Sequence, residues 1–293
     1  MNLTELVAGN LRTMVDQEYK RAWVLGGGGL RGASEVGMAK ALAKRSLQPD
    51  LIVGTSIGSL NGAVLASAPI EESTVRLTNM WEQMEASSVF SESIIKRVGQ
   101  LLNHWTHFHS NEPLRRLVEA WVPYVKLEQA HVAIQTCAAL VETSSEHWFT
   151  EGNVIDAVLA SCALPGVLPP VRINNQHFID GGVVNSIPVS RAIELGAKEI
   201  FVLHVGHIDD PLKPPRHPWD VAMVSFEIAR RHRFHRELDA VSDNVTVHVM
   251  PTGKTPGRYN DMAKLRYNYD KAIRIQIDTA EEAGNKFLDE LGL

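Results

Sequence analysis

One serine stands between two glycines at the junction of an expected strand and an expected helix. Residues 51–60 read LIVGTSIGSL, so Gly54 and Gly58 flank Ser56 in a Gly-x-Ser-x-Gly pattern. This pattern is typical of a nucleophile elbow, a strained turn that holds a serine hydroxyl above a sheet. The same pattern also occurs by chance. Alone it therefore leaves open whether Ser56 is a nucleophile or the glycines merely turn the chain.

A glycine-rich segment, GGGGLRG at residues 26–32, follows the first expected strand and opens a helix. Its backbone amides, together with the unpaired N–H groups of the helix start, are suited to bind phosphate or the oxyanion of a tetrahedral intermediate. The spacing Gly27-x-Gly29-x-x-Gly32 also matches the dinucleotide fingerprint. That fingerprint needs an acidic residue just beyond the second strand, whereas Asp50 precedes that strand. The segment thus favours an oxyanion hole or a structural turn over a nucleotide site.

A carboxylate followed by two glycines, Asp180-Gly181-Gly182, comes after the apolar pair Phe178-Ile179. Asp-Gly is among the commonest turn dipeptides, so by itself this segment indicates only a turn. It gains weight from the two motifs that precede it in the chain.

The elements that must position these motifs alternate between strand and helix, which is typical of a parallel sheet covered on both faces. The pattern predicts strands at 22–25, 51–53, 131–141, 171–179 (or a hairpin), 200–205 and 245–250. Between them it predicts helices at 33–44, from 57, at 154–161, 189–195 and 220–239, and a C-terminal helix that docks on the core. The expected fold class is therefore α/β, a three-layer α/β/α sandwich with a mainly parallel sheet.

No internal repeat divides the chain, so one domain over residues 22–293 is the simplest organisation. Residues 1–21 are expected to form an amphipathic N-terminal helix, because their apolar residues fall on one helical face. The mixed segment 70–125 is the expected lid or cap.

Composition excludes several classes of protein. With 293 residues, 44% hydrophobic and 22% charged, the chain is neither disordered nor fibrous. A net charge of −5 argues against nucleic acid as the main partner. Cys137 and Cys162 are expected to be buried, reduced thiols. Without a secretory signal or an apolar run of about 20 residues, the chain is expected to be cytoplasmic.

In this order, the three motifs resemble those of the patatin-like phospholipases. They stand here as Gly27–Gly32, Gly54–Gly58 and Asp180–Gly182, and the segment ASCALPG at 160–166 also resembles the stretch upstream of the family's aspartate. The resemblance spans about residues 22–205 and implies a patatin-like α/β/α fold.

The resemblance implies a Ser–Asp dyad in place of a triad. Ser56 would be the nucleophile and Asp180 the base that accepts its proton directly. Gly28 and Gly29 would donate backbone N–H groups to the oxyanion, assisted by the N–H of Ile57. The remaining motif residues would support this arrangement: Gly27, Arg31, Gly32, Gly54, Gly58, Gly181 and Gly182. The family's substrates are lipid acyl esters, chiefly phospholipids and lysophospholipids, cleaved through an acyl-enzyme without metal or cofactor.

Two other functions stay open at this point. A Ser–His–Asp α/β-hydrolase could use Ser56 and Asp180 with His204 or His207. Against it, only one clear strand precedes the elbow strand, and the glycine loop lacks the histidine of an HGGG motif. The second alternative is a non-catalytic regulator that keeps the fold.

Histidines and arginines elsewhere have plainer explanations. His104, His107 and His109 lack the companions that a metal site needs, so no metal is expected. The basic run at 230–236 is typical of a solvated helix face, and attraction to an anionic membrane surface is the alternative. That attraction, with a lipid substrate, would make the protein peripheral at membranes.

Overall fold

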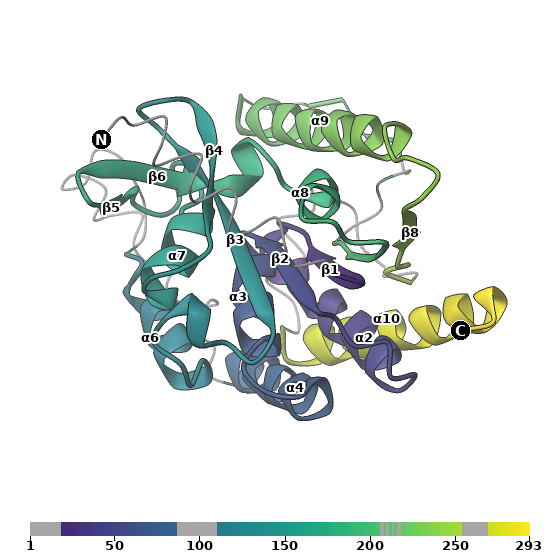
Figure 1. Ribbon diagram of the computed structural model, residues 1–293. Helices are drawn as coiled ribbons and strands as arrows, with labels where there is room; N and C mark the ends of the chain where they lie inside the picture. Colours follow the sequence, from purple (N-terminus) through teal and green to yellow (C-terminus); the bar gives the residue numbers. More distant parts are fainter. Residues whose placement is uncertain are drawn as a thin grey trace, which may run out of the picture.

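The computed structural model describes residues 19–86, 110–253 and 269–293, apart from residues 206, 207, 209, 210, 213, 216 and 217. Within these residues the chain forms one sheet with helices packed against both of its faces (Figure 1).

The sheet is mainly parallel. Its strand order is β5-β6-β3-β2-β1-β7-β8, and β4 also pairs with β3. The parallel strands are β1 (Arg21–Leu25), β2 (Leu51–Thr55), β3 (Ala133–Leu140), β7 (Glu199–Leu203) and β8 (Thr246–Val249). Antiparallel pairs join β3 to β4 (Ser145–Phe149) and β6 (Gln176–Asp180), and join β6 to β5 (Val171–Ile173).

Side chains of β1 alternate between the two faces of the sheet, as the pleat of a strand requires. Trp23 and Leu25 pack into the larger core, whereas Ala22 and Val24 pack into the smaller one on the opposite face. The larger core lies under α2 (Ala33–Ala43), α3 (Ile57–Leu65), α4 (Ile70–Ala86), α7 (Val154–Ser161) and α10 (Tyr269–Leu291). The smaller core is covered by α8 (Val189–Glu194) and α9 (Pro218–Asp239), which lie across the sheet from α2 and α10 in Figure 1.

These layers confirm the expected α/β/α sandwich, with differences in detail. The segment 171–179 is a hairpin, β5 and β6, and the C-terminal helix docks on the core through residues such as Ile273 and Ile277. Strand β4 has no counterpart among the predicted elements. Cys137 and Cys162 are buried free thiols, as expected.

Two predicted regions fall partly outside the described residues. The N-terminal helix lies there up to residue 18, and Arg21, assigned to it, is instead the first residue of β1. Within the expected lid, α4 contributes the fully buried Trp81 to the core, and α6 (Glu112–Trp121) follows the gap at 87–109. The lid itself stays a prediction, since residues 87–109 are not described.

Candidate active site

The side chains of Ser56 and Asp180 are in direct contact. Ser56 Oγ donates a hydrogen bond of 2.6 Å to Asp180 Oδ2. Ser56 follows the last residue of β2 and precedes the first residue of α3, with φ of 55° and ψ of −126°. A positive φ is uncommon for a residue with a side chain, and such strain recurs at active sites. Ser56 thus occupies a strained strand-to-helix turn with its hydroxyl aimed at a carboxylate.

The glycines on either side of Ser56 lie where backbone segments approach too closely for a side chain. A Cβ on Gly54 would lie 2.6 Å from the carbonyl oxygen of Gly58, and a Cβ on Gly58 would lie 2.3 Å from that of Leu25. Neither distance is tolerated between real atoms. Glycine at 54 therefore lets α3 approach β2 this closely, and glycine at 58 lets α3 approach the end of β1. The Gly-x-Ser-x-Gly spacing follows from these two close approaches.

Asp180 is held at the end of β6 by its own turn. Its Oδ1 accepts a 2.7 Å hydrogen bond from the N–H of Gly182, within the 3₁₀ helix η4 (Gly181–Val183). Gly181 packs on β3, where an added Cβ would lie 2.3 Å from the carbonyl oxygen of Cys137. Asp180 is 2% exposed, and this burial raises its pKa from 3.8 to about 6, against the opposing effect of the bonds from Ser56 and Gly182.

The glycine-rich loop adjoins the serine. Gly26 N–H donates to Leu203 O at 3.0 Å and Gly27 N–H to Ser186 O at 2.9 Å, which fixes the first half of the loop. A Cβ on Gly27 would lie 3.3 Å from Ser56 Cβ, so the loop passes beside the nucleophile candidate.

Gly28 and Gly29 come next in this loop and are exposed. Within the described part of the chain, neither of their N–H groups has an acceptor. Gly29 has a φ of 60°, a conformation that glycine adopts without steric cost. Two backbone donors without an acceptor among the described residues thus follow directly after Gly27, the loop residue beside Ser56.

The other motif residues surround these parts. Ile57 begins α3, where helix N–H groups lack intrahelical acceptors, and its side chain fills the space against Gly32, 2.6 Å from where a Cβ would be. Arg31 lies half-buried in the 3₁₀ helix η1 (Gly29–Gly32), with its N–H 3.4 Å from Gly28 O. Gly182 faces the ring of Phe226 from α9, 2.9 Å from where a Cβ would lie.

Comparison with known proteins assigns the fold to a family. A family model described as patatin-like phospholipase matches residues 23–193, more than half of the chain. The chain belongs to the patatin-like phospholipase family. This confirms the resemblance that the three motifs indicated.

Two curated relatives match this patatin-like chain over 64% of its length. Lysophospholipase NTE1 of Lodderomyces elongisporus is 28% identical over 187 residues. Patatin-like phospholipase domain-containing protein 6 of Homo sapiens is 29% identical over 197 residues. The chain spans only 12% and 14% of the length of these two relatives.

Among solved structures, VipD from Legionella pneumophila is similar with a TM-score of 0.40 and 14% identity, covering 90% of this chain and 67% of VipD.

In this patatin-like site the aspartate meets the serine without a histidine between them. Oδ2 of Asp180 is bonded to Ser56 and Oδ1 to Gly182. His204 lies buried just after β7, with its ring centroid 6.5 Å from that of Phe234. His207 lies outside the described residues. The direct Ser56–Asp180 contact is the geometry expected of a dyad and not of a Ser–His–Asp relay.

Within the described residues, no group of three or more His, Cys, Asp or Glu side chains is placed to hold a metal ion. The histidines at 104, 107 and 109 lie outside them. None of the described helices is both long enough and apolar enough to span a bilayer.

Several arginines in the basic run of α9 form ion pairs with glutamates, which differs from a fully solvated helix face. Arg230 and Arg231 pair with Glu227, and Arg233 bridges Glu146 and Glu237. The exposed part of the run comprises His232, His235 and Arg236. Contact with a membrane through this face stays a prediction.

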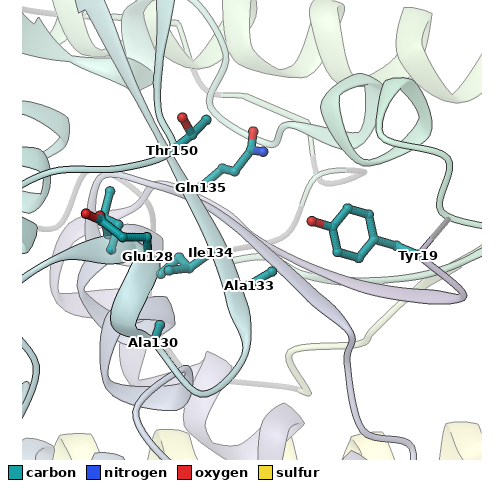
Figure 2. Close-up of a pocket in the computed structure, with 8 residues that line it drawn as sticks. Tyr19, Glu128, Ala130, Ala133, Ile134, Gln135 and Thr150 are labelled. Atoms are coloured by element: carbon teal, nitrogen blue, oxygen red, sulfur yellow. The ribbon is translucent and has the colours of Figure 1, made fainter. Parts of the chain in front are cut away.

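A pocket lies away from the dyad, near the start of β3 (Figure 2). Its lining includes Tyr19, Glu128 and Gln135. Ser56, by contrast, follows Thr55, which pairs with the later β3 residue Cys137. The pocket is thus separate from the candidate active site.

Sequence reasoning missed three buried polar groups around the site. Ser161 contacts the backbone of Ser56, Ser186 contacts the glycine loop through its carbonyl, and Glu35 bonds Asn61 below that loop. Ser161 lies in the ASCALPG segment that the family resemblance already marked, but no local pattern distinguishes its hydroxyl from that of any helical serine.

Proposed function

We propose that this protein is a serine acyl hydrolase that cleaves the acyl esters of phospholipids or lysophospholipids. The observation that carries this proposal is the 2.6 Å hydrogen bond from Ser56 Oγ to Asp180 Oδ2. The names of the relatives, lysophospholipase and patatin-like phospholipase, support the substrate class.

In the first half of the reaction, Ser56 Oγ attacks the ester carbonyl carbon while its proton passes to Asp180 Oδ2. The carbonyl oxygen becomes an oxyanion, which the N–H groups of Gly28, Gly29 and Ile57 stabilise. Collapse of this intermediate breaks the ester C–O bond. Asp180 returns the proton to the leaving alcohol, and the acyl group remains on Ser56.

In the second half, Asp180 takes a proton from water, and the resulting hydroxide attacks the acyl-enzyme. A second oxyanion forms in the same place. Its collapse breaks the bond between the acyl carbon and Ser56 Oγ, Asp180 returns its proton to Oγ, and the fatty acid leaves. The raised pKa of Asp180, about 6, suits this role because a carboxylate with its ordinary pKa of 3.8 would be a weaker base.

The proposal is tested by fatty-acid release from lysophosphatidylcholine and phosphatidylcholine vesicles. The wild type should hydrolyse at least one of them, and Ser56→Ala and Asp180→Asn should each lose about 10²-fold or more. Ser225→Ala, an exposed serine of α9, is the matched control and should retain wild-type activity. A Ser56→Ala protein that keeps full activity, or a folded wild type inactive on every acyl ester in a lipid-class panel, would contradict the proposal. The second result would favour a non-catalytic member of the family.

A further inference from the structure

A second serine contacts the backbone of the candidate nucleophile. Ser161 is the last residue of α7 and is fully buried. Its Oγ accepts a 2.9 Å hydrogen bond from the N–H of Ser56 and donates a 2.5 Å hydrogen bond to the carbonyl oxygen of Cys137. Because the hydroxyl has one proton, the bond to Cys137 turns its lone pairs toward Ser56.

The Ser161 hydroxyl lies at the end of the pairing between β2 and β3. Strands β2 and β3 pair in register up to Thr55 and Cys137. The first amide after β2, that of Ser56, is linked to the Cys137 carbonyl through the Ser161 hydroxyl. Ser161 thus bridges the end of the ladder at the residue where φ becomes positive.

The Ser56 amide depends on this bridge. The carbonyl of Ser56 accepts the hydrogen bonds of the first turn of α3, from Ser59 N–H at 2.8 Å and from Leu60 N–H at 3.4 Å. The N–H of Ser56 is bonded to Ser161 Oγ. Ser56 is partly buried, and an amide there without an acceptor costs free energy, so loss of the bridge should let the strained turn relax.

The same carbonyl also meets the turn that follows the aspartate. Gly181 packs so closely on Cys137 O that a Cβ would lie 2.3 Å from it, and Asp180 pairs with the adjacent β3 residue Ala138. Ser161 therefore ties the serine elbow to the point of β3 that also supports Asp180.

We propose that Ser161 is a positioning residue: its hydroxyl bridges the Ser56 N–H to the Cys137 carbonyl and so keeps Ser56 Oγ aimed at Asp180. The role rests on the proposed function, in which Ser56 is the nucleophile. Ser161 itself does not touch the reacting atoms.

The test measures the second-order rate at which a fluorophosphonate labels Ser56, followed by intact mass. In this reaction a Ser56 Oγ–P bond forms, the P–F bond breaks, fluoride leaves and Asp180 accepts the proton. Ser161→Ala should label about 10- to 100-fold more slowly, because the Ser56 amide loses its acceptor. Hydrolysis of lysophosphatidylcholine should show the loss in kcat, with KM changed by about twofold or less.

Ser59→Ala is the matched control, since it also removes a buried hydroxyl bonded to the Ser56 backbone. Ser59 Oγ donates to Ser56 O at 2.6 Å, but that carbonyl keeps the Ser59 N–H as a donor. Its labelling rate should stay within about threefold of wild type. Ser161→Thr, which retains a hydroxyl, should recover much of the rate lost in Ser161→Ala.

A folded Ser161→Ala that labels as fast as Ser59→Ala would overturn the positioning role. If Ser161→Ala does not fold, as judged by circular dichroism, the nearly isosteric Ser161→Cys takes its place. A Ser161→Cys that labels at the wild-type rate would overturn the role equally. Failure of the wild type to be labelled at Ser56 would instead count against the proposed function, so the two failures are distinguishable.

Discussion

The hydroxyl of Ser56 and the carboxylate of Asp180 lie 2.6 Å apart although 124 residues separate them in the chain. Strand β3 explains this proximity. Its residue Cys137 pairs with Thr55 of β2, which precedes Ser56, and the next residue, Ala138, pairs with Asp180 of β6. Two adjacent positions of one strand therefore set the distance between the two side chains.

The rate of hydrolysis should fall at acidic pH because Asp180 becomes protonated. Burial raises its pKa to about 6, and only its ionised form can accept the proton of Ser56. The value of kcat/KM should therefore be constant above pH 7, reach half its maximum near pH 6 and fall about tenfold per pH unit below it. Initial rates at low substrate concentration between pH 4.5 and 8.5 measure this profile.

A histidine base would titrate in a similar range, so the profile needs a control. His204→Asn and His207→Asn should each keep the same midpoint and most of the activity. A variant of either histidine that abolishes hydrolysis while remaining folded would favour the Ser–His–Asp alternative.

Gly58→Ala should destabilise the fold severely. The new Cβ would lie 2.3 Å from Leu25 O and 2.9 Å from Gly26 O, and neither backbone atom can yield without moving β1. We expect a loss of about 3 kcal/mol or more in the free energy of unfolding, or failure to fold. Urea denaturation followed by circular dichroism measures the effect.

Gly196→Ala is the comparison for this variant. Gly196 has a φ of 87° but no atom within 4 Å of an added Cβ. Only the backbone conformation opposes alanine there, which costs about 1–2 kcal/mol. Equal losses in the two variants would contradict the close approach of α3 to the end of β1 as the reason for Gly58.

The stability of Glu35→Gln relative to that of the wild type should increase as the pH rises. Glu35 is fully buried, its Oε2 accepts a 2.7 Å bond from Asn61, and burial raises its pKa well above 4.5. The folded state therefore binds the Glu35 proton more tightly than the unfolded state does. The stability that this protonation provides is complete below pH 4.5 and is lost as the pH rises toward the raised pKa.

Glutamine has no proton to lose, so the difference in Tm between Glu35→Gln and wild type should increase from pH 5 to pH 8.5. Differential scanning calorimetry at several pH values measures it. A difference that is the same at every pH would show that Glu35 is not held neutral by burial.

Local patterns predicted the parts of the site that depend on backbone sterics. Gly54, Gly58 and the glycine loop were recognisable because a junction of strand, glycine and helix is formed by a short continuous segment of the sequence. The α/β/α layering was predictable for the same reason, since burial on both faces makes β1 and β2 continuous apolar runs.

Long-range contacts account for what the sequence did not reveal. The hydroxyl of Ser161 serves an amide 105 residues away, and Glu35 sits in a helix where a charged residue suggests exposure. Strand β4 is short and only partly buried, so neither apolar alternation nor length distinguished it from a loop.

Fluorophosphonate labelling, with the labelled residue mapped by peptide mass spectrometry, tests whether Ser56 is the nucleophile and Asp180 its base. We expect one adduct, on Ser56, that is absent from Ser56→Ala and forms at least about 10²-fold more slowly in a folded Asp180→Asn. An adduct on any other residue, or an Asp180→Asn protein labelled at the wild-type rate, would contradict it.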